Sequence, residues 1–188
     1  MKKYIAMRLV LTMAAAMLAG CGAGGNTEPT QAPTEAPTEA PKASYEGTME
    51  ELVNAIITEQ PVEFMGGNIP VDLTDTSEDG LWAIKTFTGL DNADQIQDIG
   101  VYEPMMGSIA FSMVAVRANA GVDTKAMAET MKSNIDQRKW ICVEADDLMV
   151  AGCGDVVMLI MVASDTGMTA QSFVDAFQSV CGELDFAI

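Results

Sequence analysis

The repeat between residues 32 and 41 places the strongest limit on what this chain can fold into. Ala32-Pro33-Thr34-Glu35 is followed by a second Ala-Pro-Thr-Glu and a third Ala-Pro, and no large apolar side chain interrupts the run. Proline at every fourth position favours extended polyproline II, and repulsion between the glutamates stiffens the segment further. We therefore predict a tether within residues 21–45 and a single globular domain over residues 46–188.

The residues before the tether have the layout of a secretory signal. Lys2 and Lys3 precede a short apolar run that is broken only by Arg8 and Thr12. The run closes on small residues that look like a bacterial lipobox, which comprises Leu18, Ala19, Gly20 and Cys21. In lipoproteins of this type the cysteine thiol receives a diacylglycerol, and cleavage leaves that cysteine as the new N-terminus. Residues 1–20 are therefore expected to be a signal peptide.

A transmembrane helix is the alternative interpretation of this segment. Such a helix needs about 20 consecutive apolar residues, and the uninterrupted apolar stretch from Met13 to Cys21 is less than half as long. Two acyl chains on one residue suffice for stable membrane anchoring. We therefore expect lipidation at Cys21 and a position on the extracytoplasmic face of the cell membrane.

The charge of the chain excludes one class of partner. Loss of Lys2, Lys3 and Arg8 with the signal peptide leaves 7 basic and 27 acidic residues, a formal charge of −20. Sequence-independent nucleic-acid binding depends on lysine and arginine at phosphates, so we expect no nucleic acid as a partner. Strong negative charge also keeps the folded part away from anionic lipid.

The chain contains no histidine. This excludes Ser-His-Asp and Cys-His catalysis and every histidine-ligated metal site. Three cysteines remain after Cys21, namely Cys142, Cys153 and Cys181, and their wide spacing is not that of a zinc site. We expect buried small apolar residues at these positions, with one disulfide among them as the alternative.

Apolar periodicity predicts most of the secondary structure. Helices are expected after Thr48, after Ser77 with Gly89 as the stop, from Asp123 or Thr124 with Arg138 and Lys139 at the C-terminal end, and after Thr169. Residues 61–76 are expected to form a loop. Strands are expected at Ile99–Tyr102, at Ile109–Val116, and in a hairpin of Leu148–Gly152 and Val156–Ala163.

The segment Ile109–Val116 is apolar on both alternating faces, which is typical of a central strand with both faces covered. The order of the expected elements is α-α-β-β-α-β-β-α. This order indicates an α+β fold in two layers, with helices packed on a mostly antiparallel sheet of about four strands.

Two groups of carboxylates are candidate sites. The loop Asp72–Gly80 could supply oxygens to calcium, but the EF-hand spacing is absent and helix capping explains its last residues. Asp146 and Asp147 are adjacent, and neighbours in a strand point to opposite faces. We expect a solvated turn there and predict no metal, no cofactor and no catalytic residue.

Methionine is abundant, with eleven residues left after export. Soft Cu(I) ligation is one possible use, but core packing explains most of these side chains. The exception is the pair Met105 and Met106, which follows Pro104 in an expected turn. Together with Trp82 and Tyr102, these three residues are our candidate ligand or partner surface.

The sequence resembles a known family in the run Val101–Met106 and the strand that follows it. Further similarity lies in the residues Asp136–Lys139 and in the Gly152-x-Gly154-Asp155 turn. The family comprises small lipoproteins of anaerobic Gram-positive bacteria, labelled domain of unknown function 4358. This chain departs from it in its cysteines and in the apolar segment Leu148–Ala151. The resemblance implies a fold and a Gram-positive envelope location, and it transfers no active site.

Together these features predict a non-catalytic protein-docking lipoprotein of the cell envelope. A lipoprotein that binds a small solute is the first alternative, which an apolar pocket with convergent polar groups would favour. A glycan-acting enzyme that uses carboxylates alone is the second alternative, and it requires two carboxyl groups about 5–10 Å apart.

Overall fold

A computed structural model describes residues 45–188. The expected signal peptide, Cys21 and the tether up to residue 44 lie outside the described residues, and Tyr45, the last residue of the expected tether, packs against the core that α1 and α4 cover. In the described part the helices and strands are α1 (Met49–Glu59), β1 (Gly66–Asn68), α2 (Glu78–Thr88), β2 (Ile96–Pro104), β3 (Phe111–Ala118), α3 (Thr124–Asn134), β4 (Asp147–Cys153), β5 (Val156–Val162), a 3-10 turn at Ser164–Thr166, α4 (Ala170–Cys181) and β6 (Phe186–Ala187). None of the described helices is long and apolar enough to span a bilayer.

The strands form one open antiparallel sheet in the order β1-β2-β3-β5-β4-β6. The predicted hairpin of β4 and β5 is confirmed, with Cys153 opposite Val156 at its turn. Six strands are present where we expected about four. The additional strands are β1 and β6 at the two edges, and each is too short to produce a periodic pattern in the sequence.

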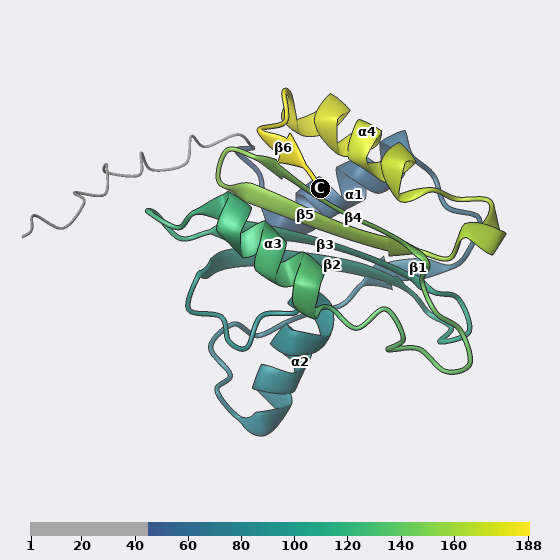
Figure 1. The fold of residues 1–188 in the computed structure, drawn as a ribbon, viewed down its shortest axis with the longest axis horizontal. Helices are drawn as coiled ribbons and strands as arrows, with labels where there is room; N and C mark the ends of the chain where they lie inside the picture. Colours follow the sequence, from purple (N-terminus) through teal and green to yellow (C-terminus); the bar gives the residue numbers. More distant parts are fainter. Residues whose placement is uncertain (1–44) are drawn as a thin grey trace, which may run out of the picture. The chain divides into compact units, whose positions relative to one another are not determined.

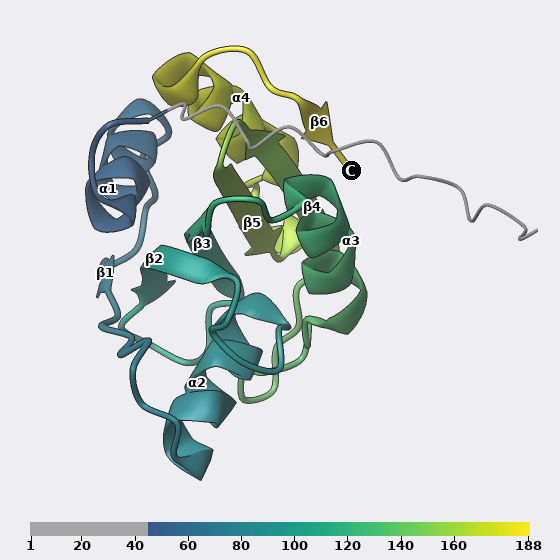
Figure 2. The same cartoon turned by 90° about the vertical axis from the view of Figure 1, so that its left-hand side faces the viewer.

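The α+β class is confirmed, but the two-layer arrangement is wrong because helices cover both faces of the sheet (Figure 1). Helices α1 and α4 pack on one face, and α2 and α3 pack on the other. Strand β5 explains why both faces are covered by helices. Its consecutive residues Met158 and Leu159 point to opposite faces of the sheet and enter different cores. Every residue of β5 is buried. The view in Figure 2 shows α1 and α3 on opposite sides of the strands.

Side-chain caps begin all four described helices where the sequence indicated. Thr48 forms a capping box with Glu51, and Asp123 accepts hydrogen bonds from the first amides of α3. Ser77 and Thr169 cap α2 and α4 through their hydroxyl oxygens. Each cap satisfies a backbone amide that the helix leaves unpaired. Gly89 ends α2 in the left-handed region, as expected for a C-terminal glycine.

Helix α3 is shorter than predicted. It ends at Asn134, so Arg138 and Lys139 lie in the loop 135–146 and not at the C-terminal end of the helix. The helix ends because Ile135 adopts an extended conformation, with φ of −64° and ψ of 138°, and Lys139 further along the loop enters the protein and forms an ion pair with Glu103 of β2. Arg138 and Lys139 therefore do not interact with the dipole at the C-terminal end of α3 in the way that the sequence predicted.

The cysteines differ in their surroundings. Cys153, the last residue of β4, is buried as predicted, and Cys181 at the end of α4 is half-buried. The prediction of burial is wrong for Cys142, which is exposed in the loop 135–146 with a φ of 64°. Its neighbours Trp140 and Val143 pack against the core that α2 and α3 cover, whereas the Cys142 side chain stays in solvent.

Candidate functional site

Three loops meet at one end of the sheet. They are residues 105–110 between β2 and β3, residues 135–146 between α3 and β4, and residues 163–169 between β5 and α4. Antiparallel pairing places the ends of β2 and β5 beside the starts of β3 and β4. Backbone hydrogen bonds join the loops, from Ala163 N to Ala110 O at 2.9 Å and from Ile141 N to Gly107 O at 3.3 Å. These bonds hold three distant stretches of sequence in one surface.

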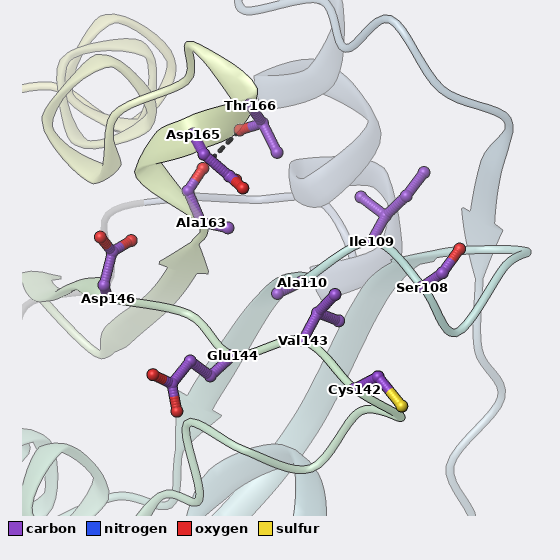
Figure 3. Close-up of a pocket in the computed structure, with 10 residues that line it drawn as sticks. All are labelled: Ser108, Ile109, Ala110, Cys142, Val143, Glu144, Asp146, Ala163, Asp165 and Thr166. Atoms are coloured by element: carbon purple, nitrogen blue, oxygen red, sulfur yellow. Dashed lines mark hydrogen bonds between the residues drawn. The ribbon is translucent and has the colours of Figure 1, made fainter.

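The loops enclose an open pocket of about 550 Å³. Figure 3 shows Ala110 and Val143 near its middle, Cys142 and Ser108 on one side, and the carboxylates of Glu144 and Asp146 on the other. The remaining lining residues are Ile109, Ala163, Asp165 and Thr166. The polar groups around this pocket are therefore mainly acidic.

Hydrogen bonds already occupy the adjacent carboxylates Asp146 and Asp147. The Ser164 amide and hydroxyl donate to Asp146 at 2.7 and 2.6 Å, and these bonds hold the pKa of Asp146 below its usual value. Asp147 accepts from the Ala170 amide at 2.8 Å, at the N-terminus of α4. Through these hydrogen bonds Asp146 orders the turn after β5, and Asp147 binds the first amide of α4.

Four large apolar side chains near the pocket are exposed to solvent. We call them the apolar rim, and they are Met65, Met105, Met106 and Ile141. Their exposed fractions lie between 60% and 78%. The Met105 amide donates to the Met65 carbonyl at 2.9 Å, and Ile141 is joined to Gly107 as described above. Backbone hydrogen bonds therefore join the three segments that carry the rim, namely the residue before β1, the loop 105–110 and the loop 135–146.

A buried ion pair holds the loop 135–146 against the sheet. The Lys139 ammonium lies 2.7 Å from the Glu103 carboxylate, and the two side chains are only 7% and 17% exposed. The same ammonium donates to the Thr86 carbonyl at 3.2 Å and to the Ser112 hydroxyl at 3.0 Å. It also lies 4.8 Å from the centre of the Phe87 ring. These contacts fix the chain two residues before Ile141.

Ser112 and Lys139 are the residue types of a catalytic serine–lysine pair, but their arrangement differs from such a pair. Ser112 is fully buried, so a substrate cannot reach its hydroxyl. The ammonium donates a hydrogen bond to the hydroxyl oxygen, and a general base must instead accept the hydroxyl proton. Burial lowers the pKa of Lys139, more than the neighbouring carboxylate of Glu103 raises it. We assign this cluster a positioning role for the rim.

The structure brings together part of the predicted partner surface. Met105 and Met106 lie in the exposed turn after Pro104. Tyr102 is half-buried, with its ring 6.3 Å from that of Phe111, and it packs inside the core that α1 and α4 cover. Trp82 is 67% exposed on α2, a separate element. Two of the five predicted residues therefore belong to the rim, and Pro104 adjoins it.

The remaining candidate sites have structural explanations. Asp72 accepts from Thr74 and Asp75 accepts from the Ser77 amide, so these acids order the loop before α2. Within residues 45–188, no cluster of three or more potential metal-ligating side chains is found. Met113, Met127, Met131, Met158 and Met161 are buried core residues.

Sequence reasoning missed Met65, Ile141 and the pair of Lys139 with Glu103. Met65 and Ile141 lie in loops, where no periodicity distinguishes an exposed side chain from a buried one. Lys139 and Glu103 are 36 residues apart in sequence, which only the fold can bridge. A signal existed in the run Trp140-Ile141-Cys142, which is unusually apolar for a surface loop.

Comparisons of the chain with protein-family models, curated proteins and solved structures found no match. The resemblance to the Gram-positive lipoproteins therefore stays a prediction.

Proposed function

We propose that this chain is a lipid-anchored lipoprotein of the cell envelope that docks a partner protein through the apolar rim. The exposure of four large apolar side chains on three hydrogen-bonded segments supports this function. Scattered surface hydrophobic residues are ordinary, but contiguous ones mark interaction sites. The lipobox at Leu18–Cys21 supports the membrane attachment.

Charge favours a protein over a lipid surface as the partner. The pocket beside the rim carries Glu144, Asp146 and Asp165, and the whole chain has a formal charge of −17. An anionic bilayer repels such a surface. The complementary partner presents an apolar patch flanked by lysine or arginine side chains, an arrangement that raises the association rate at low salt.

The buried ion pair contributes to docking by ordering the rim in advance. Lys139 and Glu103 fix the backbone that carries Ile141. A loop that is ordered before binding loses less conformational entropy in the complex. The tether adds a second advantage, because it confines the domain near partners in the same membrane and raises their effective concentration.

Site-specific photo-cross-linking in the intact envelope tests the proposal. A photoreactive residue at Gly107 stands next to Met106, and a side chain there meets no atom within 4 Å. We expect a discrete protein adduct from this position in the full chain. The yield should fall by about tenfold or more when Met105 and Met106 are both replaced by serine, because loss of central interface contacts costs one or more factors of ten in affinity.

Trp82 provides the matched control, since it has similar exposure on a different element. Trp82→Ser should leave the adduct from position 107 unchanged. An adduct that persists at full yield in the double serine variant would show that the rim does not form the docking surface. Adducts with lipid alone would contradict a protein partner.

The acidic pocket supports a second candidate function, the binding of a small cationic solute. Its volume of about 550 Å³ lies within the range of ligand sites. A thermal-shift measurement with short diamines and amino sugars tests this function. A ligand at 100 times its dissociation constant adds about 2.7 kcal/mol to stability, and a Glu144→Gln variant should lose part of that shift. Equal shifts in both proteins would exclude this pocket.

A further inference from the structure

The ends of β4 and α4 bring two sulfur atoms together inside the protein. Cys153 is the last residue of β4, and Cys181 is the last residue of α4. The Cys153 thiol is hydrogen-bonded to the carbonyl oxygens of Cys181 and Glu183, each at 3.4 Å. The two thiols also interact with each other directly. Both are held by packed elements, because α4 lies on the face of the sheet that receives the Cys153 side chain.

The third cysteine cannot compete for either partner within one molecule. Cys142 precedes β4, whereas Cys153 ends it. The seven residues of β4 separate the two ends of the strand by about 20 Å at 3.3–3.4 Å per residue. A disulfide requires Cα atoms about 4.4–6.8 Å apart. Only Cys153 and Cys181 are therefore placed to pair.

We propose that Cys153 and Cys181 form a disulfide that joins the end of β4 to the end of α4. The oxidant is a second disulfide, either a small molecule or a protein. The Cys181 thiolate attacks it and forms a mixed disulfide, which releases one thiolate. The Cys153 thiolate then attacks the Cys181 sulfur and releases the second thiolate. The two cysteines lose two protons and two electrons in total, and the oxidant is reduced to two thiols.

The surroundings of the sulfurs determine when this bond forms. Burial, followed by the proximity of Cys153, raises the pKa of Cys181 to about 12 in the folded protein. Thiolate is the reacting form, so exchange is slow once α4 has docked. The bond therefore forms during folding, while the thiols still have ordinary pKa values near 8.5. Afterwards the 4% exposure of Cys153 shields the bond from external thiols, which makes it a structural disulfide.

Peptide mapping of the refolded full chain tests the proposal. The chain is unfolded, reduced and refolded with a mixture of oxidised and reduced glutathione, and it is then unfolded again in denaturant with excess alkylating reagent, so that buried thiols also react. Cyanogen bromide cleaves after methionine, which places Cys142, Cys153 and Cys181 on the separate fragments 132–149, 150–158 and 169–188. We expect fragments 150–158 and 169–188 to be linked and to separate on reduction. Fragment 132–149 should carry an alkylated Cys142.

Two variants complete the experiment. Cys142→Ser should leave the link intact, because this cysteine is not involved. Cys181→Ser should abolish the link and leave Cys153 alkylated. Alkylation of both Cys153 and Cys181 in the oxidatively refolded wild-type chain would overturn the proposal, as would a link from either one to Cys142. The wild-type map decides the matter even where a variant folds poorly, and it does not depend on lipidation or docking.

Discussion

Replacement of Lys139 by methionine is expected to lower the free energy of unfolding by about 3–5 kcal/mol, the cost of breaking one side of a buried ion pair. Methionine keeps much of the lysine stem but removes the ammonium. The Glu103 carboxylate, 17% exposed, would lose its ion-pair partner. The Ser112 hydroxyl and the Thr86 carbonyl would each lose a donor. The free energy of unfolding of a native protein is only about 5–15 kcal/mol, so this loss is large.

Urea unfolding of the purified protein measures the effect, with two further variants for comparison. Lys125→Met removes an exposed lysine in the first turn of α3 and should change stability by less than about 0.5 kcal/mol. Lys139→Met combined with Glu103→Leu should recover most of the loss, because an apolar pair can replace a buried ion pair at little cost. A single Lys139→Met variant as stable as Lys125→Met would show that the ion pair does not hold the loop.

The pH dependence of stability reports on the charge of Lys139 alone, because a neutral amine still donates hydrogen bonds to Ser112 and Thr86, which methionine cannot do. Burial lowers the pKa of Lys139 below its ordinary value of 10.5. Between the folded-state pKa and 10.5 the unfolded chain binds the proton more strongly, so the contribution of Lys139 to stability rises with pH in this window, whereas the raised pKa of a reduced Cys181 acts in the opposite direction. The contribution is fully present above pH 10.5 and is lost as pH falls through the folded-state pKa. Lys139→Met should lack this alkaline rise.

Substitution of Cys21 by alanine is expected to remove the protein from the membrane fraction or to leave it unprocessed. The thiol of Cys21 is the predicted acceptor of the lipid, and alanine offers no nucleophile for that transfer. Two acyl chains provide stable anchoring, whereas the acidic remainder of the chain has no affinity for an anionic bilayer. Metabolic labelling with a fatty acid and cell fractionation measure the result.

Cys142→Ser is the matched control for lipidation, since it removes an exposed thiol far from the signal in the sequence. This variant should be labelled and fractionated like the wild type. A Cys21→Ala protein that is processed and stays with the membrane would contradict the lipobox interpretation. In that case a different segment must provide the attachment.

The sequence contained more information about the fold than the element order alone suggests. Apolar residues on both faces of Ile109–Val116 correctly indicated a strand covered on both sides, as β3 is. A two-layer arrangement would leave one of these faces uncovered. The faces of each strand are therefore a better guide to the number of layers than the number of elements. Val156–Val162 carries the same signal in every residue. Helix starts were predictable because capping depends on neighbouring residues alone.

The site was less predictable because it depends on contacts between distant residues. Met105 and Met106 could be identified, since two large apolar residues follow a proline in a turn. Met65 joins them only because β1 pairs with β2 over residues 102–104. The sequence of β1, Gly-Gly-Asn, has no β-forming character of its own. The burial of Lys139 could not be predicted for the same reason, because it depends on Glu103, which lies 36 residues away in the sequence.

The two edges of the sheet bear on aggregation between copies of the protein at high local concentration. Lipid attachment would confine all copies to a two-dimensional layer, where neighbouring molecules collide often. Exposed edge strands are templates for aggregation between chains. Here the edge strands β1 and β6 pair with only residues 102–104 of β2 and residues 151–152 of β4, so other parts of those strands have no strand partner on the outer side. Val156–Val162, an apolar segment without charge or proline of the kind that is prone to form fibrils, lies in the interior of the sheet between β3 and β4. With a strand paired on each side, this segment is not available as a template for polymerisation between neighbouring copies.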